Sequence, residues 1–258
     1  MIARLLRRPA AGRALSRLDH PEAIALAMVL AIVAAIGWLA SPFWLAVAVG
    51  AQLSLGGLGA VWLIGPARIQ LGLARYGTLA SAAVALTLFG RLLIPSAGLL
   101  LAPVAAFLLW TVLRIELEVT RTGRSGVLLD LALVVMVFGT AAGIGGLVPL
   151  DAWPPGLLLV VLGTAIPALR AAEARGRAGA EAVGQAVLHL IAVGQIGAAL
   201  ALLQLPGVVG AAILALAFHA WSGAAEALDG GASARSVIIE FGALAVLGLV
   251  VALLLHGA

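Results

Sequence analysis

Residues 181–226 read EAVGQAVLHLIAVGQIGAALALLQLPGVVGAAILALAFHAWSGAAE, and this stretch decides the fold class. It consists of two apolar runs joined by the break Gln204-Leu205-Pro206-Gly207, and each run is long enough to cross a bilayer as a helix. Each run carries one interior histidine, His189 and His219. A polar ring inside a bilayer needs a solvating partner, so both histidines are candidate functional residues.

The composition of the whole chain agrees with this reading. Of the 258 residues, 64% are hydrophobic and 10% are charged, whereas a soluble domain is about half apolar and about a quarter charged. The sequence therefore predicts an all-α, polytopic membrane protein. It contains no cysteine, which excludes disulfides and thiol chemistry, and no lysine, which excludes a Schiff base or a lysine proton relay.

Nine apolar runs are long enough to span a membrane, and Pro and Gly separate most of them. The sixth run is the shortest and contains Pro167. The expected spans are 22–40, 43–64, 77–95, 97–115, 126–148, 155–170, 182–203, 207–228 and 236–256.

The arginines fix the expected orientation. If the N-terminus is cytoplasmic and the spans alternate, fourteen of the fifteen arginines fall on the cytoplasmic side, and only Arg91 falls toward the outside. The sequence thus predicts nine spans with the N-terminus inside and the C-terminus outside. We expect the cytoplasmic membrane of a bacterium or archaeon, and the net charge of +4 reflects this topology rather than binding to nucleic acid.

Two regions make up the predicted organisation. Residues 1–21 form a basic amphipathic N-terminus, in which five arginines interleave with Ile and Leu as in a helix that lies on anionic headgroups. Residues 22–258 form a single transmembrane helical domain. Small residues are dense in it, and Gly139-x-x-x-Gly143 predicts a close helix contact.

The two histidines lie toward the cytoplasmic half of their spans, with His189 about 10 Å and His219 about 13 Å from the cytoplasmic ends. His219, Ser222, Gly223 and Glu226 follow helical spacing and share one face, which leads from mid-membrane to the cytoplasmic edge. Three interpretations are open: packing through one hydrogen bond per histidine, a proton or ion half-path, or axial haem ligation by the pair.

Other polar residues have simpler expected roles. Arg91 is expected to reach the outer headgroups. Residues 114–124 (RIELEVTRTGR) read as a solvated cytoplasmic loop or a docking surface for a soluble partner, and Asp130 as a partner for a nearby arginine. Gln52, Gln195, Thr87 and Thr111 read as interhelical hydrogen-bonding residues. No metal ligands or catalytic residues are predicted, and the prenyltransferase DxxxD and metalloprotease HExxH patterns do not occur.

Three collinear stretches, covering roughly residues 140–228, resemble the antiporter-like membrane subunits of complex I, membrane-bound hydrogenases and Mrp antiporters. Gly146–Pro155 resembles the G-L-x-P-x-H-x-W-L-P turn of that family, and Ala192–Gly197 resembles the end of its A-Y-S-S-I-x-Q-I-G helix. Ala217–Ala225 resembles the N-H-A-x-x-K-A-L helix and places His219 on the family's histidine.

The departures from this family indicate a shortened, degenerate member. Asp151 replaces the histidine of the turn, and Gly223 stands where the family has lysine. Glu116 is the residue that could correspond to the family's helix-borne glutamate. The resemblance implies a structural subunit of a larger complex, or one with a reduced proton path.

Our first hypothesis is therefore an accessory membrane subunit of an energy-transducing complex, which contacts lipid, other membrane subunits and possible soluble partners at the cytoplasmic loops. The candidate proton path consists of His219, Glu226, His189, Ser222 and Glu116. The alternatives are a free-standing transporter of a small solute or ion, and a redox anchor that binds haem or quinone; no cofactor is predicted for the first hypothesis.

Overall fold

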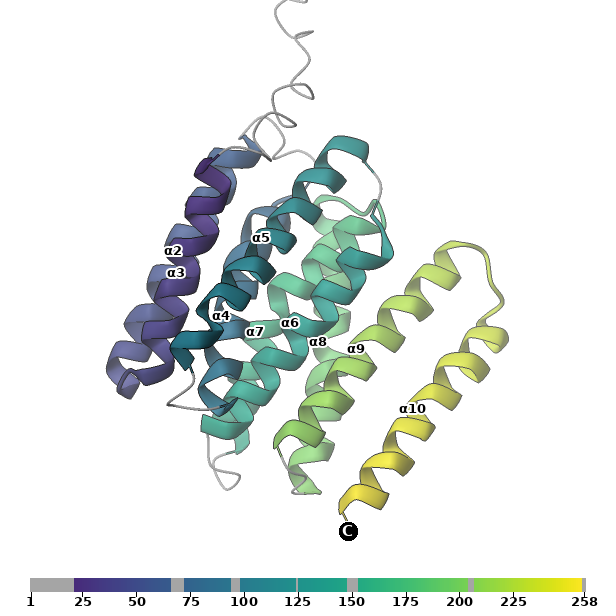
Figure 1. The fold of residues 1–258 in the computed structure, drawn as a ribbon. Coiled ribbons are helices and arrows are strands. Elements are labelled where there is room, and N and C mark those ends of the chain that lie inside the picture. The colour runs from purple at the N-terminus through teal and green to yellow at the C-terminus, as the bar shows by residue number, and fades with distance from the viewer. Residues whose placement is uncertain are drawn as a thin grey trace, which may run out of the picture.

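A computed structural model describes residues 21–65, 72–93, 98–123, 125–147, 153–203 and 207–256, and the regular structure in these ranges is entirely α-helical (Figure 1). The helices are α2 (Pro21–Leu39), α3 (Pro42–Ile64), α4 (Ala74–Leu93), α5 (Gly98–Thr122), α6 (Val127–Leu147), α7 (Trp153–Ala174), α8 (Gly179–Leu202), α9 (Gly207–Asp229) and α10 (Ala234–His256).

All nine described helices are long and apolar enough to cross a membrane, and consecutive helices run in opposite directions (Figure 1). The predicted fold class, a polytopic bundle of nine spans, is confirmed. The basic segment 1–20 lies outside the described residues. Alternation brings seven of the eight described arginines to one end of the bundle, the arginine-rich end, where α2 begins and α9 ends.

Two helices extend beyond their predicted ends. The predicted spans ended at residues 115 and 170, but α5 continues to Thr122 and α7 to Ala174. The prediction was wrong because it treated the first charge as the end of a span. Here Glu116 of α5 and Arg170 of α7 lie inside the bundle and neutralise each other.

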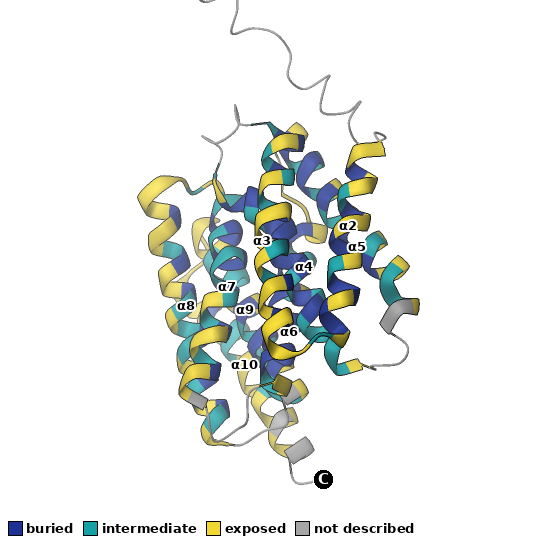
Figure 2. Ribbon diagram, turned by 90° about the vertical axis from the view of Figure 1, so that its left-hand side faces the viewer, coloured by how far each residue is buried: buried dark blue, intermediate teal, exposed yellow. Residues whose placement is uncertain are grey.

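Helix α4 is the centre of the bundle. It packs against α2, α3, α5, α6 and α7, and it has the largest buried share of the nine helices. The outward sides of the surrounding helices are exposed and apolar, as a lipid-facing surface requires (Figure 2). Helix α10 lies at the edge and packs chiefly against α9.

Glycines allow α4 to approach its neighbours closely. A Cβ on Gly143 of α6 would lie 2.4 Å from Leu88 Cβ, and one on Gly56 of α3 would lie 2.8 Å from Ala80 Cα. Real Cβ atoms do not approach this closely, so both contacts require glycine. The close packing predicted for the Gly139-x-x-x-Gly143 face is confirmed, since Gly139 also abuts Ala85.

Polar groups deep in the bundle form interhelical hydrogen bonds. Gln52 Nε2 of α3 lies 2.6 Å from Thr87 Oγ1 of α4, and both side chains are fully buried, as predicted for these residues. Arg91 has partners that the sequence did not indicate. It donates from Nη1 to the carbonyls of Gly37 and Ala40 at 3.1 and 2.5 Å, where the C-terminal end of α2 favours a cation.

Candidate functional site

A pocket of about 520 Å³ opens at the arginine-rich end between α6, α7 and α9; we call it the vestibule. Ser125, Gly126, Asp229 and Gly230 line its mouth. Residues Leu133, Val134 and Phe218 line it farthest from that end, and we call them its floor. From Asp229 to Phe218 the vestibule follows α9 for about 16 Å. The polar groups between mouth and floor are Asp130, Arg175, His219, Ser222 and Glu226.

The α9 wall of the vestibule is the face predicted from the sequence. His219, Ser222, Gly223 and Glu226 all line the same pocket, because residues three and four apart stack on one side of a helix. His219 and Glu226 are exposed to this space, and Ser222 is half-buried. The structure thus brings together three of the five predicted path residues.

The other two walls supply groups that the sequence did not predict for this site. Asp130 comes from the first turn of α6, and Arg175 follows the end of α7. Asp130 lines the same pocket as Glu226, His219 and Arg175. The expected ion pair of Asp130 with an arginine is not formed within the described residues. The sequence shows Asp130 as a carboxylate about one turn inside a predicted span. It does not show which residues of other helices lie beside Asp130.

Arg175 and Ser222 carry buried polar atoms without a hydrogen-bond partner in the described part of the chain: Nε and Nη2 of Arg175, and Oγ of Ser222. Burial lowers the pKa of the Arg175 guanidinium, and Asp229 opposes this effect. The neighbouring Arg177 is instead held at the mouth by ion pairs with Glu181 and Asp229. Its hydrogen bond to Asp229 raises the pKa of Arg177.

A second group of charges lies beside the vestibule and is buried among α4, α5 and α7. Arg170 donates from Nε and Nη2 to the two carboxylate oxygens of Glu116, both at 2.8 Å, and each side chain is 1% exposed. Arg75 Nη1 donates to Thr120 Oγ1 at 3.2 Å. Glu173 accepts a hydrogen bond from the backbone N–H of Ala74 at 3.0 Å.

This arrangement changes the interpretation of residues 114–124. Glu116 does not belong to a solvated loop, and it does not line the vestibule. Its two-pronged bond to Arg170 occupies both carboxylate oxygens, which is the geometry of a fixed ion pair. Arg114 and Arg121 of the predicted patch are exposed, and Arg121 forms an ion pair with Glu118 near the end of α5.

His189 is separate from the vestibule. It is fully buried on α8, stacks on Phe218 with 4.3 Å between ring centroids, and places Nε2 3.2 Å from the Phe218 carbonyl oxygen. Because a carbonyl only accepts, this bond requires the tautomer protonated on Nε2. His219 lines the vestibule and His189 does not.

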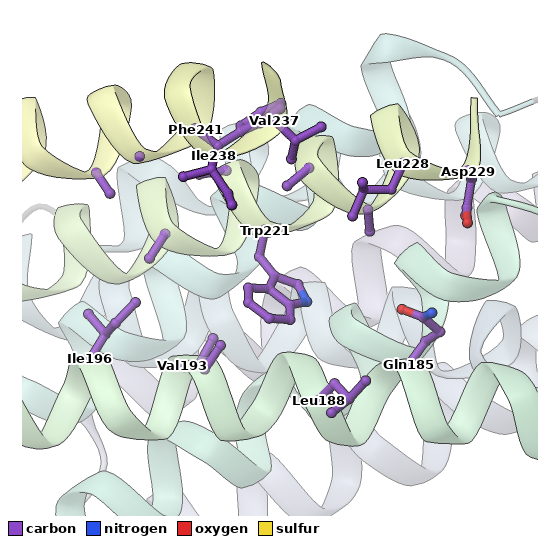
Figure 3. A pocket seen from close by; sticks show the side chains of 17 residues that line it. Gln185, Leu188, Val193, Ile196, Trp221, Leu228, Asp229, Val237, Ile238 and Phe241 are labelled. Carbon is purple, nitrogen blue, oxygen red and sulfur yellow. The ribbon is translucent and has the colours of Figure 1, made fainter. Parts of the chain in front are cut away.

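An apolar groove of about 560 Å³ lies between α8, α9 and α10 (Figure 3). Trp221 projects into it from α9, while Gln185 and Asp229 are at one end (Figure 3). Phe241 of α10 also lines it, and its ring edge would lie 2.7 Å from a Cβ placed on Gly223. A lysine at residue 223, where the resembling family has one, would have to displace this ring.

Comparisons with known proteins add no family: the chain matches no family model, no curated protein and no solved structure. Of the three stretches with a family resemblance, Ala192–Gly197 lies in α8 and Ala217–Ala225 lies in α9. Half of the Gly146–Pro155 turn, including Asp151, lies outside the described residues.

Proposed function

We propose that the protein is a membrane subunit of an ion-translocating complex, and that its vestibule is the half of a proton path that opens to the cytoplasm. One observation carries this proposal: Asp130, His219 and Glu226, from two helices, line a single pocket that is open at the arginine-rich end. Rows of such groups within a membrane are typical of proton relays. The excess of arginine at this end supports a cytoplasmic orientation.

The apolar floor supports the role of a subunit. Beyond Leu133, α6 contains no charged residue up to its end at Leu147, and the part of α9 between Gly207 and Phe218 contains no polar side chain. A proton that reaches His219 thus meets no charged residue farther along these two helices. A neighbouring subunit would have to provide the remaining half of the path.

The family resemblance supports the same proposal, because it places His219 on the family's histidine. The chain has no lysine, so it would use carboxylates and His219 where that family uses a lysine. Asp130 and Glu226 are the groups available for this, since both line the vestibule with His219.

The first experiment tests assembly. The full chain is tagged in its native membrane and purified in a mild detergent, and the particle size is measured by light scattering with identification of co-purifying chains. We expect a stoichiometric assembly with other membrane proteins. A monomer that remains alone in several mild detergents would overturn the subunit proposal.

The second experiment tests the proton path. The purified assembly is reconstituted into vesicles, and proton uptake driven by a potassium diffusion potential is followed with an enclosed pH dye. We expect His219→Ala and Glu226→Gln to lower the uptake. Glu240→Gln is the matched control, since it removes a carboxylate of α10 at the same end of the bundle but outside the vestibule. Equal uptake in all three variants would leave His219 with a packing role only.

The volume of the vestibule favours a second candidate, transport of a small solute by the protein itself. A proton relay needs only a chain of water molecules, whereas about 520 Å³ falls within the range of about 300–1,000 Å³ for small-molecule sites. Uptake of radiolabelled solutes into vesicles that contain only this chain would test it, and the absence of uptake across a broad solute panel would count against it.

A further inference from the structure

The vestibule carries groups of both signs on different walls. Arg175, after α7, provides the positive charge, and Asp130 of α6 and Glu226 of α9 provide negative charges. They line the same space, yet no ion pair joins Arg175 to either carboxylate within the described residues. Charges that face one cavity without pairing leave room for a ligand that pairs with each of them.

Arg175 lacks an acceptor on this wall. Its Nε and Nη2 are buried, and neither has a hydrogen-bond partner in the described ranges. A buried charged donor that bonds to nothing is unfavourable. A carboxylate is the group that fits two donors on one edge of a guanidinium. Because Nε and Nη2 are buried, such a ligand would meet them only after the Arg175 side chain turns toward the cavity that the residue lines.

The start of α6 adds to the positive potential around Arg175. Ser125 Oγ donates to the Ala174 carbonyl at 3.0 Å, which holds the start of α6 against the end of α7. Ser125, Gly126 and Val127 also line the vestibule. The first N–H groups of a helix have no intrahelical acceptor and favour an anion.

A simple anion is nevertheless a poor ligand for this pocket. Asp130, Glu226 and Asp229 all line it and would repel a second negative charge. A simple amine would be attracted by these carboxylates but would leave the donors of Arg175 unpaired. A molecule that carries both a carboxylate and an ammonium group avoids a net negative charge near the carboxylates and also provides an acceptor for Arg175.

From these contacts we infer that the vestibule binds a small zwitterion of the amino-acid class. Its carboxylate lies on Arg175 and the start of α6, and its ammonium group lies between Asp130 and Glu226. This inference rests on the second candidate function, because it names the solute class for the same pocket, and it does not require a proton path.

The test measures binding of radiolabelled L-alanine and L-lysine to the purified full chain by scintillation proximity, with acetate and methylammonium as single-charge competitors. We expect saturable binding of at least one amino acid and weak competition by either single-charge compound. Arg175→Gln is expected to weaken binding on the order of ten- to a hundredfold, the loss of a charge-assisted pair. Arg235→Gln is the matched control, because Arg235 lies at the same end on α10 and does not line the vestibule.

A second measurement separates failure of this inference from failure of the vestibule. The chain has no cysteine, so His219→Cys, at an exposed position that lines the vestibule, provides a single thiol whose labelling by a membrane-impermeant reagent reports access. We expect labelling, and protection by the bound amino acid. Labelling without amino-acid binding would overturn the zwitterion inference and leave the proton half-path standing. No labelling in a folded protein would overturn both, because the pocket would then be closed to water.

Discussion

Arg170 and Glu116 form a two-pronged ion pair between α7 and α5 in which each side chain is 1% exposed. The pair lies where sequence analysis places the end of both spans, and it allows two charged residues to remain within the bundle. Continuum arguments and mutational data show that such pairs are weak sources of stability, but that removing one partner is costly.

Removing one partner of this pair should strongly destabilise the protein. Glu116→Ala leaves Arg170 buried without its counter-charge, so we expect a loss of about 3–5 kcal/mol in the free energy of unfolding. The double variant Glu116→Leu with Arg170→Met should be less affected than either single variant. Denaturant titration in detergent measures this, with Glu118→Ala, which breaks the exposed pair with Arg121, as a nearly neutral control. Equal losses for the single and double variants would contradict the prediction.

Gly143→Ala should weaken the contact between α6 and α4. The added Cβ would lie 2.4 Å from Leu88 Cβ and 2.5 Å from the Leu88 carbonyl carbon, so the helices must separate. Overpacking of this kind costs about 1–3 kcal/mol. The matched control is Gly50→Ala on α3, where nothing lies within 4 Å of the added atom. A thermal shift in detergent should show a lower midpoint for Gly143→Ala alone, and unchanged midpoints for both variants would refute the close contact.

Substitution of His189 and of His219 should have different effects on stability and on proton uptake. His189→Leu removes the bond to the Phe218 carbonyl within the core, and we expect a loss of about 1–3 kcal/mol in stability. The same substitution at His219, which faces the vestibule, should leave stability nearly unchanged but lower proton uptake. Unfolding titration and vesicle uptake on both variants test this, and a stability loss at His219 as large as that at His189 would contradict it.

Single cysteines should report the orientation of the bundle. Ser233→Cys, at the arginine-rich end, and Ser41→Cys, between α2 and α3 at the opposite end, are both at exposed positions. In intact cells we expect an impermeant thiol reagent to label Ser41→Cys directly, and Ser233→Cys only after the membrane is opened. The reverse pattern would place the vestibule on the outer side and remove the cytoplasmic half-path.

The fold could be predicted from the sequence because a single physical quantity, the length of each apolar run, determines it. The assumption that the spans alternate placed nearly all arginines on one side, and the alternating helix directions in Figure 1 agree with it. The α9 wall of the vestibule was predicted for the same reason, since His219, Ser222 and Glu226 depend only on the local helical repeat.

What the sequence did not predict depends on contacts between distant segments. Asp130 and Arg175 join the site only because α6 packs against both α7 and α9. Arg91 donates to carbonyls at the end of α2 because α2 packs against α4. Periodicity within one span contains no information about which helix becomes its neighbour.

The central position of α4 has a consequence for how the protein is made. This helix has the lowest mean hydropathy of the nine candidate spans, and it carries Arg75, Thr87 and Arg91. Facing lipid alone, it would expose these groups to hydrocarbon. The partners of Thr87 and Arg91 precede α4 in the chain, namely Gln52 for Thr87 and the Gly37 and Ala40 carbonyls for Arg91, whereas the partner of Arg75, Thr120 of α5, follows it. We therefore expect α2 and α3 to remain at the insertion machinery until α4 has been synthesised. The three helices would then enter the bilayer as one unit.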